Sequence, residues 1–591
     1  MNTRTIYAYS VLIGLLSGVC ALVFNAMLSS LSEWTMGGLV HLSVPRPGGE
    51  GHRVVPAGGG EAEFHRWLLI LLPVIGGLIA GFLIKRFAPE AAGTGTDAYI
   101  ESFHEKGGRV RGRAAVVKAF ATLATIAGGG SAGKEGPTAQ IGSGIGSAIG
   151  NVLRMGARAR RTMLLAGAAG GLGAIFKAPL GGALTAVEVL YKEDLETDAL
   201  TPCILSSVSA YTVYCSVEGF DHVFSFQERI FHRPVELIVY AILGLLCSAV
   251  GYVYVRILHG SQRVFDSLPI HPYLVPPLGG LLVGLIGFFF PPVLGAGLGY
   301  IQALLDGDGL GDLGRSATIL ALAAGLKILT TSFTISSGQS GGVFAPSLFI
   351  GGMLGGLVGQ VGHNISPDLV PNVTPYIVVG MGAFFAGVAN APIASLIMVS
   401  ELTGAYELLP PLMIVATISL ITSRRYSIYV AQVDNKFDSK AHLWEMSPSW
   451  LKKTTIEEAF KGHFNQAAII PNSLPYPQVL QKARELRQRD FILVDSDGKL
   501  TGLVALDDLV LPEELADLGP LVLAQDLANQ RPIMVEVSQP LIQVLEKLTD
   551  REFDKVPVVD RAGFVLGYIE YRDLLDLYAQ GQQVEVALPP V

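Results

Sequence analysis

Long apolar segments follow one another along the chain up to about residue 432. Thr5 to Ser32 contains no Asp, Glu, Lys or Arg, and the segments Pro272 to Leu305 and Pro375 to Ser400 are likewise free of formal charge. The first segment is too long for the apolar core of a signal peptide and has the length of a membrane-spanning helix. Other apolar segments are shorter and are interrupted by Gly or Pro, which predicts discontinuous helices that end inside the bilayer.

The pattern becomes that of an ordinary soluble protein beyond residue 432. The stretches DFILVDSDGKLTGLVALDDLV (490–510) and DKVPVVDRAGFVLGYIEYRDLL (554–575) each contain an apolar strand, an acidic turn with Gly, a second strand and an Asp-Leu pair that opens a helix. These patterns predict a membrane domain at 1–432, a linker at 433–446 and a soluble domain at 447–591.

The two units of this soluble domain, about 466–515 and 525–580, resemble a pair of cystathionine-β-synthase (CBS) domains. Such pairs often bind adenine nucleotides, so the resemblance implies that Asp508 and Asp573 are candidate contacts to a nucleotide. The hydroxyl residues that accompany these aspartates in many nucleotide-binding pairs are replaced here. The alternative is that both aspartates simply cap helices.

Composition supports a membrane protein. Half of the 591 residues are hydrophobic and only 16% are charged, whereas soluble domains usually carry about 25%. The formal net charge of −8 argues against nucleic acid as a partner. The four cysteines lie in apolar stretches without a C-x-x-C pair, so we expect packing residues and neither metal ligands nor a disulfide framework.

Two sequence blocks occur twice in the predicted membrane domain. SAGKEGPTAQIG (131–142) aligns without gaps with SGGVFAPSLFIG (340–351), and KAPLGGALTAVEVL (177–190) aligns with NAPIASLIMVSELT (390–403). The blocks come in the same order, which makes a chance match in glycine-rich sequence improbable.

The repeat predicts two related halves at about 70–215 and 275–432. Internally repeated halves are typical of transporters, which hold their substrate near the membrane midplane where broken helices meet. We therefore expect a mostly α-helical polytopic membrane protein with two inverted-repeat halves, broken and tilted helices, and a C-terminal α/β CBS-domain pair.

A charged pair stands in the first repeated block, inside the stretch GGGSAGKEGP (128–137). Gly128, Gly133 and Lys134 fit the start of a phosphate-binding G-x-x-x-x-G-K loop. Glu135, however, occupies the place of the Ser or Thr that would hold Mg²⁺, and it would repel phosphate. An ATP-driven pump, which this loop would indicate, is therefore only a remote alternative.

An anion site within the membrane explains the same stretch better. A glycine-rich turn followed by Pro marks a helix N-terminus, and Pro137 and Pro346 have this position in the two halves. Helix N-termini offer N–H groups without intrahelical partners and the positive end of the helix dipole. Two N-termini that face each other would bind a dehydrated anion without the tight hold of a full positive charge.

The motifs GKEGP (133–137), GGVFAP (341–346) and ELTG (401–404) are similar to those of the CLC family of chloride channels and proton-coupled chloride exchangers. The likeness extends over the whole predicted membrane domain, and CBS pairs also occur in that family. The resemblance implies a chloride-transporting protein, not an enzyme, that needs no cofactor. It also implies a homodimer in a lipid bilayer, with a separate pathway in each subunit.

The resemblance further implies which residues contact chloride. In the first anion loop, Asp97 stands where the family usually has Pro, and we expect Asp97 to cap the next helix. SIYV (427–430) resembles a family motif with a pore tyrosine, which favours Tyr429 over Tyr426. The residues expected to contact chloride lie in loops and offer it amides, hydroxyls or positive charge. They are Thr94, Gly95, Lys134, Gly136, Val343, Phe344, Ala345 and Tyr429.

Glu135 is the expected gate. Its carboxylate would occupy an anion position over a helix N-terminus until chloride displaces it or a proton neutralises it. Exchangers of the family commonly carry a second glutamate one residue after Glu188, where this chain has Val189, and channels commonly carry Lys before the gate. Both features favour a passive chloride channel, with a proton-coupled exchanger as the alternative. Glu188 and Glu401 are candidate proton relays, with helix capping or pairing as their structural alternative.

Basic residues collect at 107–113, 154–161 and 423–425. The positive-inside rule places such loops in the cytoplasm. The N-terminus and the CBS pair, which follows the last of these loops, are expected there too. The polar segment around 43–66 then lies outside. We expect a multi-pass protein of the plasma (inner) membrane.

Overall fold

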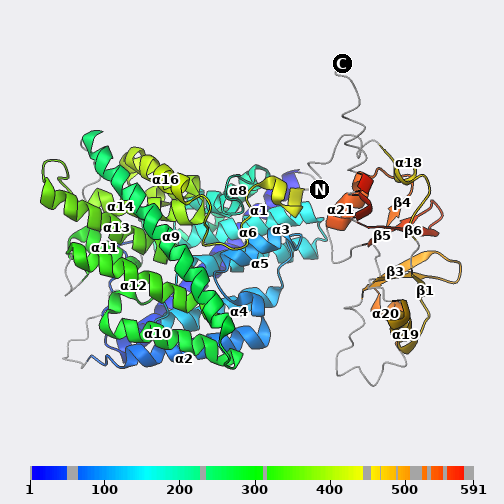
Figure 1. The fold of residues 1–591 in the computed structure, drawn as a ribbon, viewed down its shortest axis with the longest axis horizontal. Coiled ribbons are helices and arrows are strands. Elements are labelled where there is room, and N and C mark those ends of the chain that lie inside the picture. Colours follow the sequence, from blue (N-terminus) through cyan, green and yellow to red (C-terminus); the bar gives the residue numbers. More distant parts are fainter. Residues whose placement is uncertain are drawn as a thin grey trace, which may run out of the picture. The chain divides into compact units, whose positions relative to one another are not determined.

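The chain forms two compact units, Met1–Asp438 and Ser439–Val591 (Figure 1). The structure is a computed structural model. In the first unit and the start of the second, it describes residues 3–49, 64–225, 234–310 and 316–442. In the rest of the second unit, the described residues are 454–465, 468–486, 490–505, 522–528, 534–549, 555–570, 572–574 and 576–577.

The first unit is built of helices. Its first part contains α1 (Thr3–Ser32), η1 (Glu33–Leu39), α2 (Leu68–Phe87), η2 (Pro89–Ala91), α3 (Thr96–His104), α4 (Gly112–Ala127), α5 (Glu135–Val152), α6 (Ala157–Ile175), α7 (Pro179–Glu188), η3 (Thr197–Ala199) and α8 (Leu200–Glu218). Its second part contains η4 (Pro234–Glu236), α9 (Leu237–Ser267), η5 (Pro272–Leu274), α10 (Val275–Phe289), η6 (Pro291–Val293), α11 (Leu298–Asp306), α12 (Ala317–Ser336), α13 (Phe344–Ile365), α14 (Thr374–Ala389), α15 (Pro392–Thr403), η8 (Tyr406–Leu408), α16 (Leu409–Ser423) and η9 (Lys436–Asp438).

The two predicted halves have the same order of elements. In the first, α2 is followed by a short 3₁₀ turn, the short helix α3, and then α4, α5, α6, α7 and α8. In the second, α10 is followed by a 3₁₀ turn, the short helix α11, and then α12, α13, α14, α15 and α16. This correspondence confirms the organisation in two related halves that the repeated sequence blocks predict.

The long charge-free segments are broken, as their Gly and Pro residues predict. Pro272 to Leu305 divides into α10 and α11, and α11 begins after Gly297, which has a φ of 85°. Pro375 to Ser400 divides at Asn390, which has a φ of 52° between α14 and α15. Lys177 has the same φ of 52° at the matching place before α7. Each half therefore starts a helix at a left-handed residue followed by Ala-Pro.

Close helix contacts in both halves depend on glycine. A Cβ on Gly142 of α5 would lie 2.1 Å from the carbonyl oxygen of Gly167 on α6. The matching pair in the second half is Gly351 of α13, where a Cβ would lie 2.3 Å from the carbonyl oxygen of Gly380 on α14. Small residues permit this approach of backbones, as they do at membrane helix interfaces generally.

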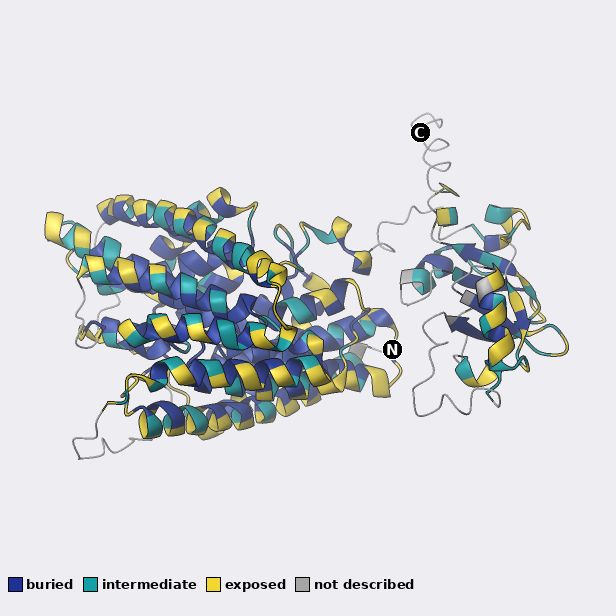
Figure 2. Cartoon of the chain, turned by 60° about the horizontal axis from the view of Figure 1, so that its bottom comes forward, coloured by how far each residue is buried: buried dark blue, intermediate teal, exposed yellow. Residues whose placement is uncertain are grey.

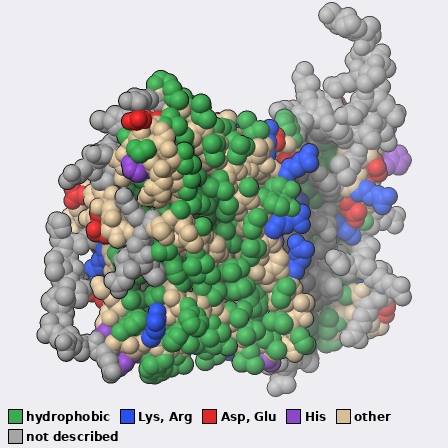
Figure 3. Space-filling view, turned by 60° about the vertical axis from the view of Figure 1, so that its left-hand side comes forward, with side chains coloured by type: hydrophobic (Ala, Val, Ile, Leu, Met, Phe, Trp, Pro, Cys, Tyr) green, Lys and Arg blue, Asp and Glu red, His purple; other side chains and the backbone are tan. Residues whose placement is uncertain are grey.

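The outer face of the first unit suits a lipid environment. Eight helices of the described residues are long and apolar enough to cross a membrane. Hydrophobic side chains cover most of the face shown in Figure 3, and the outer helices in Figure 2 each present an exposed side and a buried side. Phe82 on α2 and Leu245 on α9, for example, are apolar and more than half exposed. The chain is thus a multi-pass membrane protein.

The second unit contains two small sheets of like topology. In each, the first strand pair is parallel and the second antiparallel, and a helix joins the parallel pair, as parallel strands require. The predicted pair of CBS-like units is confirmed by this repeat. The elements are η10 (Lys440–His442), α18 (Ile456–Phe460), β1 (Ile469–Pro471), α19 (Tyr476–Leu486), β2 (Asp490–Val494), β3 (Leu500–Ala505), α20 (Ala524–Leu527), β4 (Val535–Glu536), α21 (Ile542–Thr549), β5 (Lys555–Val559) and β6 (Val565–Glu570).

The structure accounts for one of the two candidate nucleotide contacts by the capping alternative. Asp573 Oδ2 accepts hydrogen bonds from the backbone N–H of Glu570 and from Asn465 Nδ2, both at 2.7 Å. This is the geometry of a carboxylate that caps the start of a helix. Asp508 lies outside the described residues. Binding of an adenine nucleotide stays a prediction.

Candidate functional site

Three loops that precede helices are joined by backbone hydrogen bonds at the centre of the first unit. The N–H groups of Gly133 and Gly342 each donate to the other's carbonyl oxygen at 2.7 Å. A third loop joins them, because the N–H of Gly341 donates to the carbonyl oxygen of Gly93 at 3.2 Å. The N-termini of α3, α5 and α13 therefore meet, although the first and last of these helices are about 250 residues apart in the sequence.

Glycine at these positions lets the three loops approach. A Cβ on Gly136 would lie 2.1 Å from the carbonyl oxygen of Thr94, and a Cβ on Gly95 would lie 2.6 Å from the carbonyl oxygen of Gly136. Gly95 also has a φ of 77°, which only glycine adopts readily. These contacts explain why the sequence is rich in glycine here.

The three helix N-termini can attract an anion. The N-cap residues of α3, α5 and α13 are Gly95, Lys134 and Val343, which have no side-chain acceptor for the N–H groups of their helices. N–H groups in the first turn of a helix have no intrahelical partner. Three converging sets of them, with the positive ends of three helix dipoles, form a region of positive potential.

The Glu135 side chain lies where the N-termini of α3, α5 and α13 meet, which we call the junction. Glu135 is the first residue of α5 and is only 1% exposed. A Cβ placed on Gly133 would be 2.0 Å from Glu135 Oε2 and 3.1 Å from the Cβ of Ala345. The carboxylate therefore folds back over the paired loops and lies close to the start of α13.

The Lys134 side chain has a different contact from that of Glu135. It is 7% exposed, and its Nζ donates a hydrogen bond to Asn25 Oδ1 on α1 at 2.9 Å. Its positive charge is thus held close to the junction and is anchored on another helix.

In the first anion loop, the hydrogen bonds of Asp97 differ from those expected. Thr94 Oγ1 accepts the Asp97 N–H at 3.2 Å, so the threonine and not the aspartate binds an N–H group at the start of α3. Asp97 Oδ2 accepts the Thr94 hydroxyl at 2.8 Å, and Oδ1 accepts the backbone N–H of Ala431 at 3.0 Å. The prediction that Asp97 caps its helix is wrong, because its carboxylate is turned towards a loop 334 residues further along the chain.

This second loop carries the predicted pore tyrosine. Tyr429 is buried, its N–H donates to Ser427 Oγ at 3.0 Å, and its side chain contacts Thr96 at the start of α3. Tyr426 instead packs its ring against Tyr252, with ring centroids 4.7 Å apart. Of the two candidates, only Tyr429 is placed at the junction.

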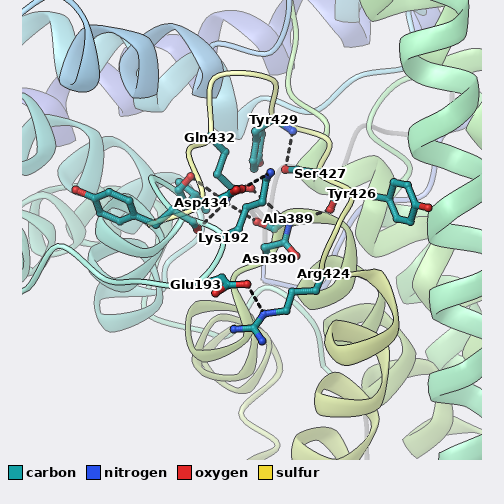
Figure 4. A network of polar contacts seen from close by, with 12 residues as sticks. Lys192, Glu193, Ala389, Asn390, Arg424, Tyr426, Ser427, Tyr429, Gln432 and Asp434 are labelled. Atoms are coloured by element: carbon teal, nitrogen blue, oxygen red, sulfur yellow. Dashed lines mark hydrogen bonds and ion pairs between the residues drawn. The ribbon is translucent and has the colours of Figure 1, made fainter. Parts of the chain in front are cut away.

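A network of side-chain amides holds the loop that carries Tyr429, which we call the tyrosine loop (Figure 4). The Gln432 side-chain amide donates to the carbonyl oxygens of Val189, Tyr191 and Ala389 at 3.2, 2.9 and 3.0 Å. Asn390 Nδ2 donates to the carbonyl oxygen of Tyr426 at 2.8 Å. The tyrosine loop is therefore held against the turn that follows α7 and the turn that follows α14.

A matched pair of buried lysines, which no predicted site residue included, holds two of the turns. Lys118 Nζ on α4 donates to the carbonyl oxygens of Ala91 and Gly93 at 3.2 and 2.7 Å. Lys327 Nζ on α12 donates to those of Val293 and Gly295 at 3.0 and 2.7 Å. Both lysines are fully buried. They stabilise the turns before α3 and α11, and their equal spacing with the repeated blocks was a signal that could have found them.

Glu188 and Glu401 cap each other's helices. Glu188, the last residue of α7, accepts the N–H groups of Ile393 and Ala394 at the start of α15, at 3.1 and 2.6 Å. Glu401, near the end of α15, accepts those of the first turn of α7, Leu180 and Gly181, at 3.2 and 2.7 Å. Each carboxylate thus binds the positive end of the partner helix, which supports the capping alternative for both residues.

Phe344 contributes to the junction with both its backbone and its ring. It is the first residue of α13, and its ring contacts Phe176 and Phe385, with centroids 4.4 and 4.2 Å apart. Val343 and Ala345, on either side, are buried as well. The aromatic cluster gives the junction an apolar wall, which excludes water and strengthens the electrostatic interactions inside.

Comparison with known proteins assigns the fold. The voltage gated chloride channel family matches residues 76–424, and the CBS domain matches residues 524–580. The chain belongs to the voltage gated chloride channel (CLC) family. The resemblance that the three short motifs predicted is thereby confirmed.

Similar proteins carry two kinds of name. A putative chloride channel protein, ClcB-like, from Ralstonia nicotianae is 29% identical over 419 residues, which cover 70% of this chain and 92% of the relative. The H⁺/Cl⁻ exchange transporter ClcA of Vibrio vulnificus is 31% identical over 370 residues, which cover 61% of this chain and 77% of the relative.

A solved CLC structure shares the fold. The structure of a slow cyanobacterial Cl⁻/H⁺ antiporter matches with a TM-score of 0.60 and 23% identity, covering 72% of this chain and 95% of that chain. At this identity the match concerns the fold alone.

Proposed function

We propose that this CLC protein exchanges chloride for protons across a membrane. The observation that carries the proposal is the place of Glu135, a buried carboxylate over the meeting point of three helix N-termini. The same positive potential attracts a carboxylate and a chloride ion. Chloride and the ionised side chain therefore compete for one region, and protonation of Glu135 releases it.

The competition couples the two ions. When chloride enters the junction, the Glu135 carboxylate has to leave, and it becomes available to a proton. When the proton is given up, the charged carboxylate returns and displaces chloride. An ionisable group inside the membrane is energetically costly, so its presence points to a function.

Backbone amides at the start of α13 are the proposed chloride donors, with the Tyr429 hydroxyl beside them. Thr94 is expected to contribute less than its place in the first anion loop suggests, because its hydroxyl donates to Asp97. Gly95 and Gly136 serve by permitting the close approach of the loops, and Lys134 by adding positive potential.

The alternative to a passive channel gains weight from the comparisons. Lys134 and Val189 favoured a channel, but the ClcA relative is named as an exchange transporter. The reciprocal caps of Glu188 and Glu401 support a structural role for both carboxylates. We further propose a homodimer in the plasma membrane, on the strength of the family membership. The basic loops support a cytoplasmic place for the CBS pair.

Flux from liposomes tests the proposal. The purified full-length protein is reconstituted, and a chloride gradient is applied while external chloride and pH are recorded. An exchanger moves protons against their gradient as chloride flows, and Glu135→Ala abolishes the proton movement while chloride still crosses. Chloride flux without any proton movement in the unaltered protein would instead establish the passive channel.

A further inference from the structure

One face of α9 carries basic and aromatic side chains beside the tyrosine loop. Residues that follow one another at intervals of three or four lie on the same side of a helix. On α9 these are Tyr252, Arg256, His259 and Arg263. Because α9 lies between the two halves of the repeat, the scaffold that the halves share does not account for this face.

Two contacts join this face to the tyrosine loop. The Tyr252 ring packs against that of Tyr426, with centroids 4.7 Å apart, and His259 Nε2 is 2.9 Å from the carbonyl oxygen of Ser427. Figure 4 shows the Tyr426 side chain pointing away from the side-chain amides, so the loop is held by the amides on one side and by α9 on the other. Ser427 Oγ accepts the N–H of Tyr429. A ligand on this face of α9 therefore acts directly on the loop that carries Tyr429.

Two arginines at this place have no counter-ion on the protein. The Arg256 guanidinium lies over the Tyr252 ring, 5.1 Å from its centroid, and Arg425 follows the end of α16. Both arginines are exposed. Among the described residues, no carboxylate forms an ion pair with either of them, whereas Arg424 is paired with Glu193 at 2.9 Å. The two guanidinium groups are therefore available to an anion.

These arginines lie where the apolar part of the unit ends. The membrane-spanning segment Tyr406–Ser423 ends two residues before Arg425. Val253 on α9 and Ile421 on α16 are apolar and are 47% and 68% exposed. In membrane proteins such apolar side chains contact lipid tails, and Arg and Tyr at the ends of spanning helices reach the headgroups. An occupant of this surface therefore combines an anionic group with hydrocarbon.

We propose that Arg256 and Arg425 bind the phosphate of an anionic phospholipid, in the leaflet at which residues 424–425 lie. Guanidinium groups bind phosphate oxygens in pairs, with strong charge-assisted hydrogen bonds. Arg263, two turns further along α9, adds positive potential, and the acyl chains lie over Val253 and Ile421. Free phosphate would satisfy the arginines but would leave the apolar surface uncovered, so the chemistry of the surface favours the lipid. The bound headgroup then braces the tyrosine loop against α9.

Native mass spectrometry of the purified full-length protein, titrated with phospholipid, tests the binding. We expect phosphatidylglycerol to bind in preference to phosphatidylcholine. The double variant Arg256→Gln with Arg425→Gln should bind phosphatidylglycerol about 30-fold more weakly, which corresponds to about 1 kcal/mol for each arginine near a headgroup. The matched control is Arg111→Gln with Arg158→Gln, which removes the same charge from two exposed arginines that each have a carboxylate partner. The control should bind phosphatidylglycerol like the unaltered protein.

Amide hydrogen exchange measures the effect on the tyrosine loop. Phosphatidylglycerol should slow exchange of residues 424–431 in the unaltered protein and in the control, and it should leave exchange unchanged in the double variant. Thermal unfolding without added lipid checks that both variants are folded, because their unfolding temperatures should match that of the unaltered protein.

Each contrary result has a defined meaning. Equal binding of phosphatidylglycerol by the unaltered protein and by the double variant would overturn the site. Displacement of the lipid by inorganic phosphate alone would overturn the lipid as its occupant. If another part of the chain or a second copy covers these arginines, phosphatidylglycerol does not bind at them, and the proposal fails. None of these measurements depends on proton coupling, so the result holds whether or not the protein is an exchanger.

Discussion

The two halves of the membrane unit have the same scaffold but different chemistry. Both begin a short helix after a turn held by a buried lysine, and both contain a helix capped by a glutamate of the other half. The aligned blocks, however, set Glu135 opposite Phe344 and Lys134 opposite Val343. Features present twice build the fold, whereas features present once are the candidates for function.

The same distinction applies to the first anion loop and the corresponding loop of the second half. Gly93-Thr94-Gly95 in the first half corresponds to Gly295-Ala296-Gly297 in the second. The glycines of both loops have positive φ values, 71° and 77° in one and 60° and 85° in the other. The hydroxyl and the nearby carboxylate of Asp97 are found only in the first half, where we expect them to affect the anion.

The largest expected effect comes from removing the carboxylate of Glu135, because the aligned position of the second half has no charge. Glu135→Gln removes the only charge that distinguishes the two helix starts at this aligned position, so proton coupling should be lost. Proton flux in liposomes is expected to fall by at least about 100-fold, with chloride flux retained. Phe344→Leu, at the matching position, is the control and should leave proton coupling in place. Equal loss in both variants would mean that the helix start as a whole, and not the carboxylate, couples the ions.

The buried lysines should have equal structural effects. Lys118→Met and Lys327→Met each leave one buried carbonyl oxygen, that of Ala91 or of Gly295, without a donor, which costs about 1–3 kcal/mol for each unsatisfied group. The carbonyl oxygens of Gly93 and Val293 each keep a second donor, the N–H of Gly341 and the hydroxyl of Thr330. We therefore expect a clear and similar drop in the thermal unfolding temperature of the purified protein for both variants. A drop for Lys118 alone would indicate that the two halves are not equivalent in stability.

The reciprocal caps should affect stability and not coupling. Glu188→Gln and Glu401→Gln each weaken two hydrogen bonds to helix N–H groups, at a cost of about 0.5–2 kcal/mol for a lost cap. Thermal unfolding should show a similar, smaller decrease for both, and the ratio of proton to chloride flux should not change. A selective loss of proton flux in Glu188→Gln would restore its role as a proton relay.

The sequence alone predicts the scaffold well and the site in part. Charge-free segments, Pro at helix starts and repeated blocks are local signals, and they identify the broken helices, the two halves and the helix start that carries Glu135. The contact between Asp97 and Ala431 joins positions far apart in the chain, and no local pattern indicates it. Lys118 and Lys327 also escape a local reading, because a lone lysine in an apolar helix shows neither its burial nor its carbonyl partners.

The smallest expected effect concerns the loop in which Asp97 acts. Asp97→Asn keeps one oxygen, which can accept the N–H of Ala431, and places an NH₂ group beside the Thr94 hydroxyl, which can accept from it. The change removes a negative charge from the vicinity of the anion. We expect chloride to bind about three- to tenfold more tightly, since an effective dielectric constant near 20 leaves a charge several ångströms away worth about 1 kcal/mol or more. Isothermal titration calorimetry of the purified protein measures the change.

Thr94→Ala, which copies Ala296 of the second half, is the companion variant. If the hydroxyl is fully engaged by Asp97, chloride affinity should hardly change. Weaker chloride binding in Thr94→Ala would show that the hydroxyl turns towards the anion despite Asp97. The difference between the first anion loop and its counterpart in the second half would then lie in the hydroxyl itself.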